Sequence, residues 1–155
     1  YGIDINEECQ QYESDRTKIF IGDQGDVSFL RNIKAKIPKI DIIIDDGSHR
    51  AKDQKITFEE MYYHLKTPGV YLVEDIELNY WKNKDLNSPD NFMTHMKNKI
   101  DELNIRKTMP AKIAQSYPFK DTEVRFTNCT NNISFYDNVV VLEKKQMSKA
   151  KEIRK

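Results

Sequence analysis

Two apolar runs in this sequence end abruptly in acidic residues. Residues 40–44 are mostly apolar and are followed by Asp45, Asp46, Gly47, Ser48 and His49. Residues 69–73 form a second run, which is followed by Glu74 and Asp75. Short apolar runs of this kind are typical of strands buried in a parallel sheet. Ligands of open α/β sheets bind beyond the carboxyl ends of the strands, so both sets of polar side chains are expected at a binding edge.

Carboxylates at the ends of two neighbouring strands suit a hard cation. Asp46, Glu74 and Asp75 offer oxygen ligands of the kind that Mg²⁺ accepts, with water and substrate oxygens completing an octahedron. Such an ion would hold two substrate oxygens and lower the pKa of one of them. Without a cation, clustered carboxylates repel one another and at least one should take up a proton. The alternative is structural: Asp45 and Asp46 would cap the next helix, and Glu74 and Asp75 would be solvated loop acids.

His49 lies three residues after Asp46, beyond the same predicted strand end. A neutral imidazole is the side chain best suited to accept a proton near pH 7, so His49 is a candidate general base. The alternative is a histidine at a helix start that bonds to the backbone. His64 and His95 fall in predicted helices, and we expect no catalytic role for either.

The elements that must position these residues alternate between strand and helix. Apolar residues at helical spacing predict helices over residues 26–37, 52–65 and 90–103. Strands are predicted over residues 1–5, 18–21, 40–44, 70–73, 124–126, 133–135 and 139–142. Residues 67–69 are predicted to form a turn, and residues 136–138 to close a tight hairpin. The alternation predicts an α/β fold with a mostly parallel sheet and a C-terminal antiparallel hairpin.

Length and composition predict one domain over residues 1–144, followed by a basic tail at residues 145–155. Lys and Arg number 25, as do Asp and Glu, so no overall charge favours nucleic acid as a partner. Cys9 and Cys129 are isolated, which suits a reducing compartment and argues against a disulfide scaffold or a zinc site. No apolar run is long enough to span a membrane, and Tyr1 begins no signal-like segment. We expect a cytoplasmic protein that binds neither nucleic acid nor membrane, with a homo-oligomer possible.

Three motifs, in this order, resemble those of a known family. They are residues 45–49 with Gln54 and Phe58, then residues 69–75 with Tyr80 and Trp81, and finally residues 133–144. In these motifs the chain is similar to the metal-dependent sugar O-methyltransferases of macrolide biosynthesis, of the mycinamicin and macrocin type. These are class I S-adenosylmethionine enzymes, and cephalosporin-hydroxylase-like proteins share the pattern. The resemblance covers most of residues 1–144 and is weakest over residues 82–120.

The resemblance implies an S-adenosylmethionine-dependent O-methyltransferase that acts on a hydroxyl of a sugar or related small molecule. It implies a Rossmann-like sheet with helices on both faces. It also implies Asp46, Glu74 and Asp75 as ligands of Mg²⁺ or Mn²⁺, and His49 alone as the catalytic base. The alternative function is a degenerate methyltransferase fold that binds a partner without catalytic activity.

Four residues are expected to contact the S-adenosylmethionine. Asp4, at a predicted strand end, is placed to accept hydrogen bonds from both ribose hydroxyls. Asp23 and Gln24 would lie near the adenine, and Asp45 near the sulfonium side. The alternative for residues 22–25 is an ordinary turn without a ligand.

The sequence departs from the family in one respect. Class I methyltransferases carry a glycine-rich loop after their first strand, whereas the five glycines of this chain, at positions 2, 22, 25, 47 and 69, form no such loop. By the resemblance, residues 1–5 correspond to the second strand, so the first strand and its loop would lie upstream or be missing. That strand would be central in the sheet, and the 155 residues alone are therefore expected to be poorly stable.

Overall fold

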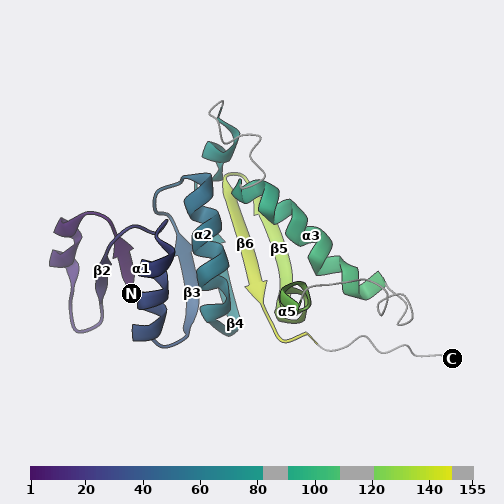
Figure 1. Cartoon of the computed structure of the whole chain (residues 1–155), viewed down its shortest axis with the longest axis horizontal. Helices are drawn as coiled ribbons and strands as arrows, with labels where there is room; N and C mark the ends of the chain where they lie inside the picture. Colours follow the sequence, from purple (N-terminus) through teal and green to yellow (C-terminus); the bar gives the residue numbers. More distant parts are fainter. Residues whose placement is uncertain (82–90, 109–120, 148–155) are drawn as a thin grey trace.

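A computed structural model describes residues 1–81, 91–108 and 121–147 of the chain (Figure 1). Its strands are β1 (Gly2–Asp4), β2 (Ile19–Ile21), β3 (Ile40–Asp45), β4 (Leu65–Val73), β5 (Thr130–Tyr136) and β6 (Val139–Lys144). Its α-helices are α1 (Val27–Lys36), α2 (Ala51–Met61), α3 (Phe92–Thr108) and α5 (Asp121–Cys129). Short 3₁₀ helices are η1 (Glu7–Tyr12), η2 (Tyr62–His64) and η3 (Ile76–Tyr80).

The strands form two separate sheets. β1 and β2 make a parallel pair, and a second sheet has the order β3-β4-β6-β5. In that second sheet only β3 and β4 run parallel, while β6 pairs antiparallel with both β4 and β5. The α/β class and the closing hairpin are therefore confirmed. The prediction of a mostly parallel sheet is met only in part, because the hairpin adds two antiparallel pairings to the larger sheet.

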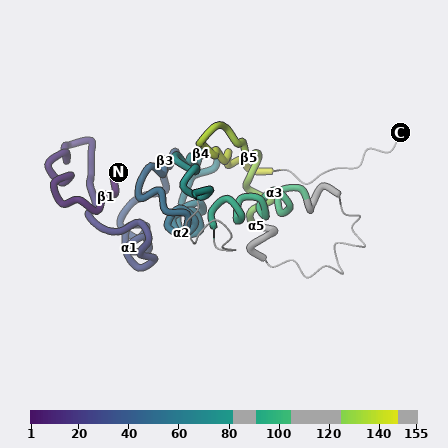
Figure 2. Tube along the Cα trace, turned by 90° about the horizontal axis from the view of Figure 1, so that it is seen from above, coloured from purple at the N-terminus to yellow at the C-terminus, as the bar shows by residue number. Residues whose placement is uncertain are grey.

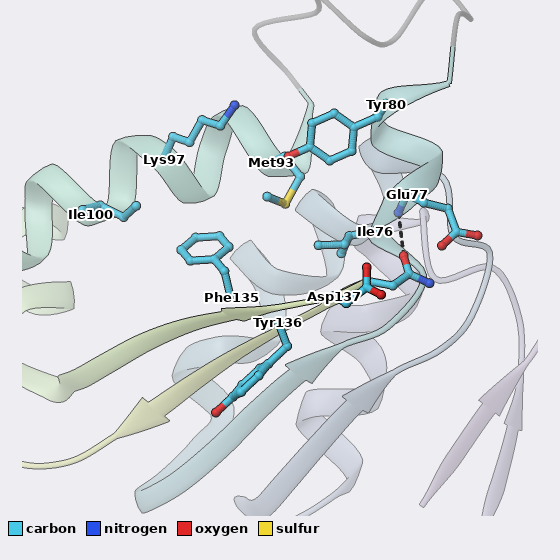
Figure 3. A pocket seen from close by; sticks show the side chains of 10 residues that line it. Ile76, Glu77, Tyr80, Met93, Lys97, Ile100, Phe135, Tyr136 and Asp137 are labelled. Carbon is cyan, nitrogen blue, oxygen red and sulfur yellow. Dashed lines mark hydrogen bonds between the residues drawn. The ribbon is translucent and has the colours of Figure 1, made fainter.

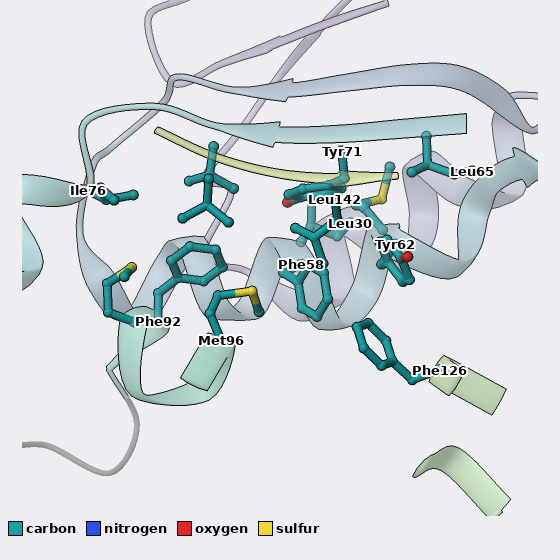
Figure 4. Close-up of a cluster of buried hydrophobic side chains, with 14 residues drawn as sticks. Leu30, Phe58, Tyr62, Leu65, Tyr71, Ile76, Phe92, Met96, Phe126 and Leu142 are labelled. Carbon is teal, nitrogen blue, oxygen red and sulfur yellow. The ribbon is translucent and has the colours of Figure 1, made fainter. Parts of the chain in front are cut away.

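The helices lie on one side of the strands (Figure 2). Phe58 of α2 is at the centre of the core, with ring centroids 4.9 Å from Tyr62 and 5.4 Å from Tyr71. Side chains of α3 and α5, among them Phe92 and Phe126, pack under the same face of the sheet (Figure 4). Removing these large apolar and aromatic surfaces from water is the main stabilising contribution to the fold.

Helices on both faces, which the resemblance implied, are not found among the described residues. On the face away from the helices, Ile42 and Ile44 of β3 are each 62% exposed, and Tyr136 of β5 is 64% exposed. The apolar run at residues 40–44 is what a strand covered on both faces requires. In the described part of the chain, only one of its faces is covered.

An apolar cavity of about 290 Å³ separates the two sheets. Its walls include Ile3 of β1, Phe20 of β2, and Ile42 and Ile44 of β3. β1 bonds only to β2, and β3 bonds only to β4, so each has one unpaired edge among the described strands. The sheet is thus interrupted at the place where the family resemblance implies a central strand.

Two local predictions were wrong. Residues 124–126 belong to helix α5 rather than to a strand, because Phe126 is buried against Tyr62, with ring centroids 5.6 Å apart. Residues 67–69, predicted to form a turn, belong to β4 instead. This strand runs from Leu65 to Val73, with an irregularity in its pairing with β3. Three residues are too few to distinguish a strand from one turn of helix by periodicity.

The predicted basic tail begins within the described part of the chain. The backbone N–H groups of Lys145 and Met147 donate to the carbonyls of Cys129 and Asn128, at 2.8 and 3.0 Å. Residues 148–155 lie outside the described residues. In the part of the chain that the structure covers, no helix is long and apolar enough to cross a bilayer.

The buried imidazole of His95 should make the fold sensitive to acid. His95 lies on α3 with its ring centroid 5.7 Å from that of Phe58, and burial lowers its pKa from 6.5 to about 4, assisted by Lys99 and Lys55. Between these pH values the unfolded chain binds a proton that the folded chain does not, so the free energy of unfolding falls as the pH drops from 6.5 to 4. We expect His95→Leu to reduce this fall by roughly 1–3 kcal/mol. Urea unfolding at several pH values measures it, and parallel pH profiles for the two proteins would contradict it.

Candidate active site

The loop that follows β3 is fastened by the side chain of Gln24. The Gln24 amide donates to Oδ1 of Asp45 at 2.9 Å and accepts a bond from the N–H of Ser48 at 2.6 Å. A Cβ atom on Gly47 would collide with Oε1 of Gln24, so any side chain there would displace the Gln24 amide from this position. The loop therefore leaves β3 in one defined path and delivers Asp46 and His49 to the sheet edge.

Asp45 is directed into the protein. It is 5% exposed, and its carboxylate accepts bonds from Gln24 and, at 3.4 Å, from the hydroxyl of Tyr71. Burial raises its pKa to about 6, although both donors favour the ionised form. The helix-capping role considered as the alternative for Asp45 and Asp46 is not found, since α2 begins after Arg50 without a side-chain cap.

The loop after β4 lies directly beside the loop after β3. Asp45 pairs with Val73 in the parallel ladder, and the N–H of Glu74 donates to the carbonyl of Asp45 at 3.0 Å. Asp75 follows with φ of 50° and opens η3. The two apolar runs therefore bring their acidic residues to one edge, as the sequence predicted.

Asp46, His49 and Asp75 form one cluster at this edge. Nε2 of His49 lies 3.1 Å from Oδ1 of Asp46, and Nδ1 lies 3.4 Å from Oδ2 of Asp75. One ligand atom from each of the three residues falls within 4.8 Å of the others. An ion with bonds of about 2.1 Å needs its ligands within about 4.2 Å of each other, so small side-chain movements would let this set hold a divalent cation. Two carboxylates and an imidazole are also groups that commonly bind divalent metal ions.

The predicted ligand set is brought together only in part. Asp46 and Asp75 meet, but the cluster found among the described residues has His49 as its third member and does not include Glu74. The backbone of Glu74 bonds to Asp45 and, through its carbonyl, to the side-chain amide of Gln54 at 3.0 Å. Its role as a metal ligand stays a prediction.

Unusual backbone conformations are concentrated at this cluster. Among the described residues other than glycine, a positive φ is found at His49, Asp75 and Asn138, with values of 57°, 50° and 60°. Such conformations cost roughly 1–3 kcal/mol each and persist where the surrounding structure holds them, often at functional sites. Asn138 comes from the β5–β6 turn, and its amide bonds to Asp75 at 2.8 Å. The sequence around Asn138 indicates only a place in a hairpin, so its contact with Asp75 is a finding of the structure.

The residues predicted to contact S-adenosylmethionine are dispersed. Asp4 ends β1, and its pKa is lowered by the N–H of Asn6 and by the thiol of Cys9, so it is a ready hydrogen-bond acceptor. Asp23 accepts from the N–H of Gly25 at 2.7 Å, as in the ordinary turn considered as an alternative. Gln24 and Asp45 line the cavity between the sheets, but their side chains already bond to each other.

A larger cavity, of about 490 Å³, opens beside the cluster (Figure 3). Tyr80, Met93 and Phe135 contribute apolar surface, and Lys97, Asp137 and Asn138 contribute polar groups. Asn138 thus reaches both this cavity and Asp75. Tyr80 of the family motif lies in the wall of this cavity, whereas Trp81 is 58% exposed and is not among the lining residues.

Comparisons with known proteins agree with the resemblance. The demethylmacrocin O-methyltransferase of Streptomyces fradiae is 28% identical over 145 residues, which are 90% of this chain and 36% of that protein. The mycinamicin VI 2''-O-methyltransferase of Micromonospora griseorubida is 36% identical over 81 residues, covering 52% of this chain and 20% of that protein. No protein-family model matches the chain.

A solved structure matches nearly the whole chain. The MycE methyltransferase from the mycinamycin biosynthetic pathway, in complex with Mg and SAH, superposes with a TM-score of 0.79 and 25% sequence identity, over 94% of this chain and 37% of that one. The predicted resemblance is confirmed: the chain is related to sugar O-methyltransferases and has their fold. It spans between 20% and 37% of the length of these relatives.

Proposed function

We propose, from this relationship to sugar O-methyltransferases, that the protein transfers a methyl group from S-adenosylmethionine to a hydroxyl of a sugar carried by a small molecule. The observation that carries the proposal is the Asp46–His49–Asp75 cluster at the carboxyl edge of β3 and β4. It lies beside a cavity of about 490 Å³ that a small molecule could enter. Position in the fold, donor chemistry and adjacent space all suit this reaction.

His49 would act as the general base. Its two ring nitrogens face Asp46 and Asp75, so the imidazole is held in one orientation between two carboxylates. The ring is 30% exposed, which leaves it accessible to an acceptor hydroxyl. A neutral imidazole donates through one nitrogen only, so the other nitrogen keeps its lone pair and can take the hydroxyl proton as oxygen attacks the methyl carbon and the sulfonium leaves as a thioether.

Asp46 and Asp75, with Glu74 as the third expected ligand, would hold Mg²⁺ or Mn²⁺. When bound, the ion would lower the pKa of an acceptor hydroxyl. The chain's own contribution is to fix the carboxylates: Asp75 is held by Asn138, and the loop that carries Asp46 is held by Gln24, which bonds to the side chain of Asp45 and to the N–H of Ser48. Positioning is the main contribution an enzyme makes to a bimolecular transfer of this kind.

The cavity lined by Tyr80 would bind the acceptor. Aromatic and aliphatic side chains cover most of its walls, and flat aromatic surfaces pack well against sugar rings. One relative, the mycinamicin VI 2''-O-methyltransferase, is named for the methylation of a small molecule, mycinamicin VI. Asp4, Asp23, Gln24 and Asp45 remain the candidates for contact with the methyl donor.

Titration calorimetry with S-adenosylhomocysteine tests the proposal. We expect the natural protein that contains residues 1–155 to bind it, more tightly with Mg²⁺ than without. Circular dichroism is the control for folding. Folded natural protein that binds no S-adenosylhomocysteine would contradict the proposal and favour a degenerate binding module.

A further inference from the structure

The turn between β5 and β6 reaches across the sheet edge to the acidic cluster. Tyr136 and Val139 are paired at the end of the hairpin, and Asn138 lies in the two-residue turn between them. We infer that Asn138 is a positioning residue, which holds Asp75 so that one carboxylate oxygen is presented to the cluster. This inference rests on the proposed function, since it assigns Asp75 a metal to bind.

The two carboxylate oxygens of Asp75 have different partners. Its Nδ2 donates to Oδ1 of Asp75 at 2.8 Å. The other oxygen, Oδ2, lies 3.4 Å from Nδ1 of His49, inside the cluster. With Oδ1 occupied, Asp75 is arranged to bind a cation through Oδ2 alone. Partners of this kind orient metal ligands and are a regular part of metal sites.

Two further bonds hold Asn138 in place, one to its side-chain amide and one to its backbone. Its Oδ1 accepts a bond from the N–H of Glu77 at 2.8 Å, the dashed line in Figure 3. Its backbone carbonyl accepts from the N–H of Ile76 at 3.4 Å. Rotating the amide by 180° would place its oxygen against the Asp75 carboxylate and its NH₂ against an N–H group. The orientation that donates to Asp75 is therefore the one that the surroundings allow.

The requirements of the turn do not explain these bonds. Asn138 has φ of 60°, a conformation that glycine adopts freely and asparagine tolerates. A purely structural turn would accept glycine equally well. The amide that joins the turn to Asp75 is the part that glycine lacks, so Asn138→Gly separates the two roles.

Titration calorimetry with Mg²⁺ tests the inference on the natural protein. We expect Asn138→Gly to weaken Mg²⁺ binding by roughly 10- to 100-fold, as changes to the partners of metal ligands typically do. Asn131→Ala is the control, because Asn131, on β5 of the same hairpin, also donates its amide to a carboxylate, Oε2 of Glu143 at 3.2 Å, away from the cluster. The control should bind Mg²⁺ like the wild type. Folded Asn138→Gly protein with wild-type affinity would overturn the inference.

A measurement on the unmodified protein covers the case in which Asn138→Gly fails to fold. In protein labelled with ¹⁵N-asparagine, the side-chain amide signal of Asn138 should shift and saturate with Mg²⁺, while that of Asn131 stays constant. Mg²⁺ binding without a shift at Asn138 would overturn the inference and leave the proposed function intact. Absence of Mg²⁺ binding by the wild type would contradict the proposed metal site, and with it the positioning role.

Discussion

Replacement of His49 by alanine is expected to lower the rate of methyl transfer by roughly 100- to 10,000-fold, the usual contribution of a general base. Mg²⁺ and S-adenosylhomocysteine should still bind, because Asp46, Glu74 and Asp75 remain. Steady-state kinetics with a sugar acceptor, together with calorimetry for both ligands, measures the effect. His49→Asn is the better second variant, since His49 has φ of 57° and asparagine tolerates this conformation more readily than alanine does.

His64→Ala is the matched control for His49. His64 immediately precedes β4, whereas Asp75 follows the other end of that strand. Nε2 of His64 contacts the carbonyl of Pro38 at 3.0 Å. The His64→Ala variant should leave turnover unchanged. Unchanged turnover in folded His49 variants would refute the catalytic role. Loss of Mg²⁺ affinity in those variants would identify His49 as a ligand instead, which its place in the cluster also permits.

Loss of the carboxylates should abolish metal-dependent activity. We expect Asp75→Asn to weaken Mg²⁺ binding by more than the roughly 10- to 100-fold typical of changes to outer partners, because it removes a charged ligand. Glu74→Gln should also weaken the metal dependence. EDTA should suppress turnover of the wild type, and added Mg²⁺ should restore it. The Mg²⁺ affinity of each variant is measured in two ways, from the dependence of activity on Mg²⁺ concentration and by titration calorimetry.

The comparison of Glu74 with Asp75 decides which residues make up the ligand set. A wild-type Mg²⁺ titration in Glu74→Gln, with a weakened one in Asp75→Asn, would exclude Glu74 and leave Asp46, His49 and Asp75. Full activity in EDTA would contradict metal assistance altogether. Asp41→Asn is a suitable control for the loss of a carboxylate, because Asp41 pairs with Lys66 at 2.9 Å near the opposite end of β3.

The strands that carry the site could be predicted because each coincides with a short, mostly apolar run. The run before Asp45 and the run before Glu74 both became strands, and their parallel pairing brought the two loops together. Helix α5 could not be predicted, because the burial of Phe126 depends on Tyr62, which is distant in sequence. The bare face of β3 could not be predicted either, since Ile42 and Ile44 suggest cover that the described residues do not supply.

Within the site, only contacts between residues close in sequence could be predicted. Asp46 and His49 are three residues apart, and their contact follows from one loop. Asn138 is 63 positions away from Asp75, so their contact depends on how the hairpin is placed in the folded sheet. A turn residue of this type satisfies local rules by itself, and nothing in its immediate sequence indicates a second role.

The interruption between β1 and β3 has a consequence for cooperativity. Since no backbone ladder among the described strands joins the two sheets, the β1–β2 pair can lose its hydrogen bonds without breaking any pairing in the β3-β4-β6-β5 sheet. Amide protons of β1 and β2 would then exchange with solvent through openings that leave the larger sheet closed. Asp4, the candidate ribose ligand, ends β1, whereas Asp46 and Asp75 follow β3 and β4. The residue proposed to bind the methyl donor and the residues proposed to bind the metal would therefore lie on two sheets that can open separately. Binding at one site would stabilise the other only through contacts that join the two sheets.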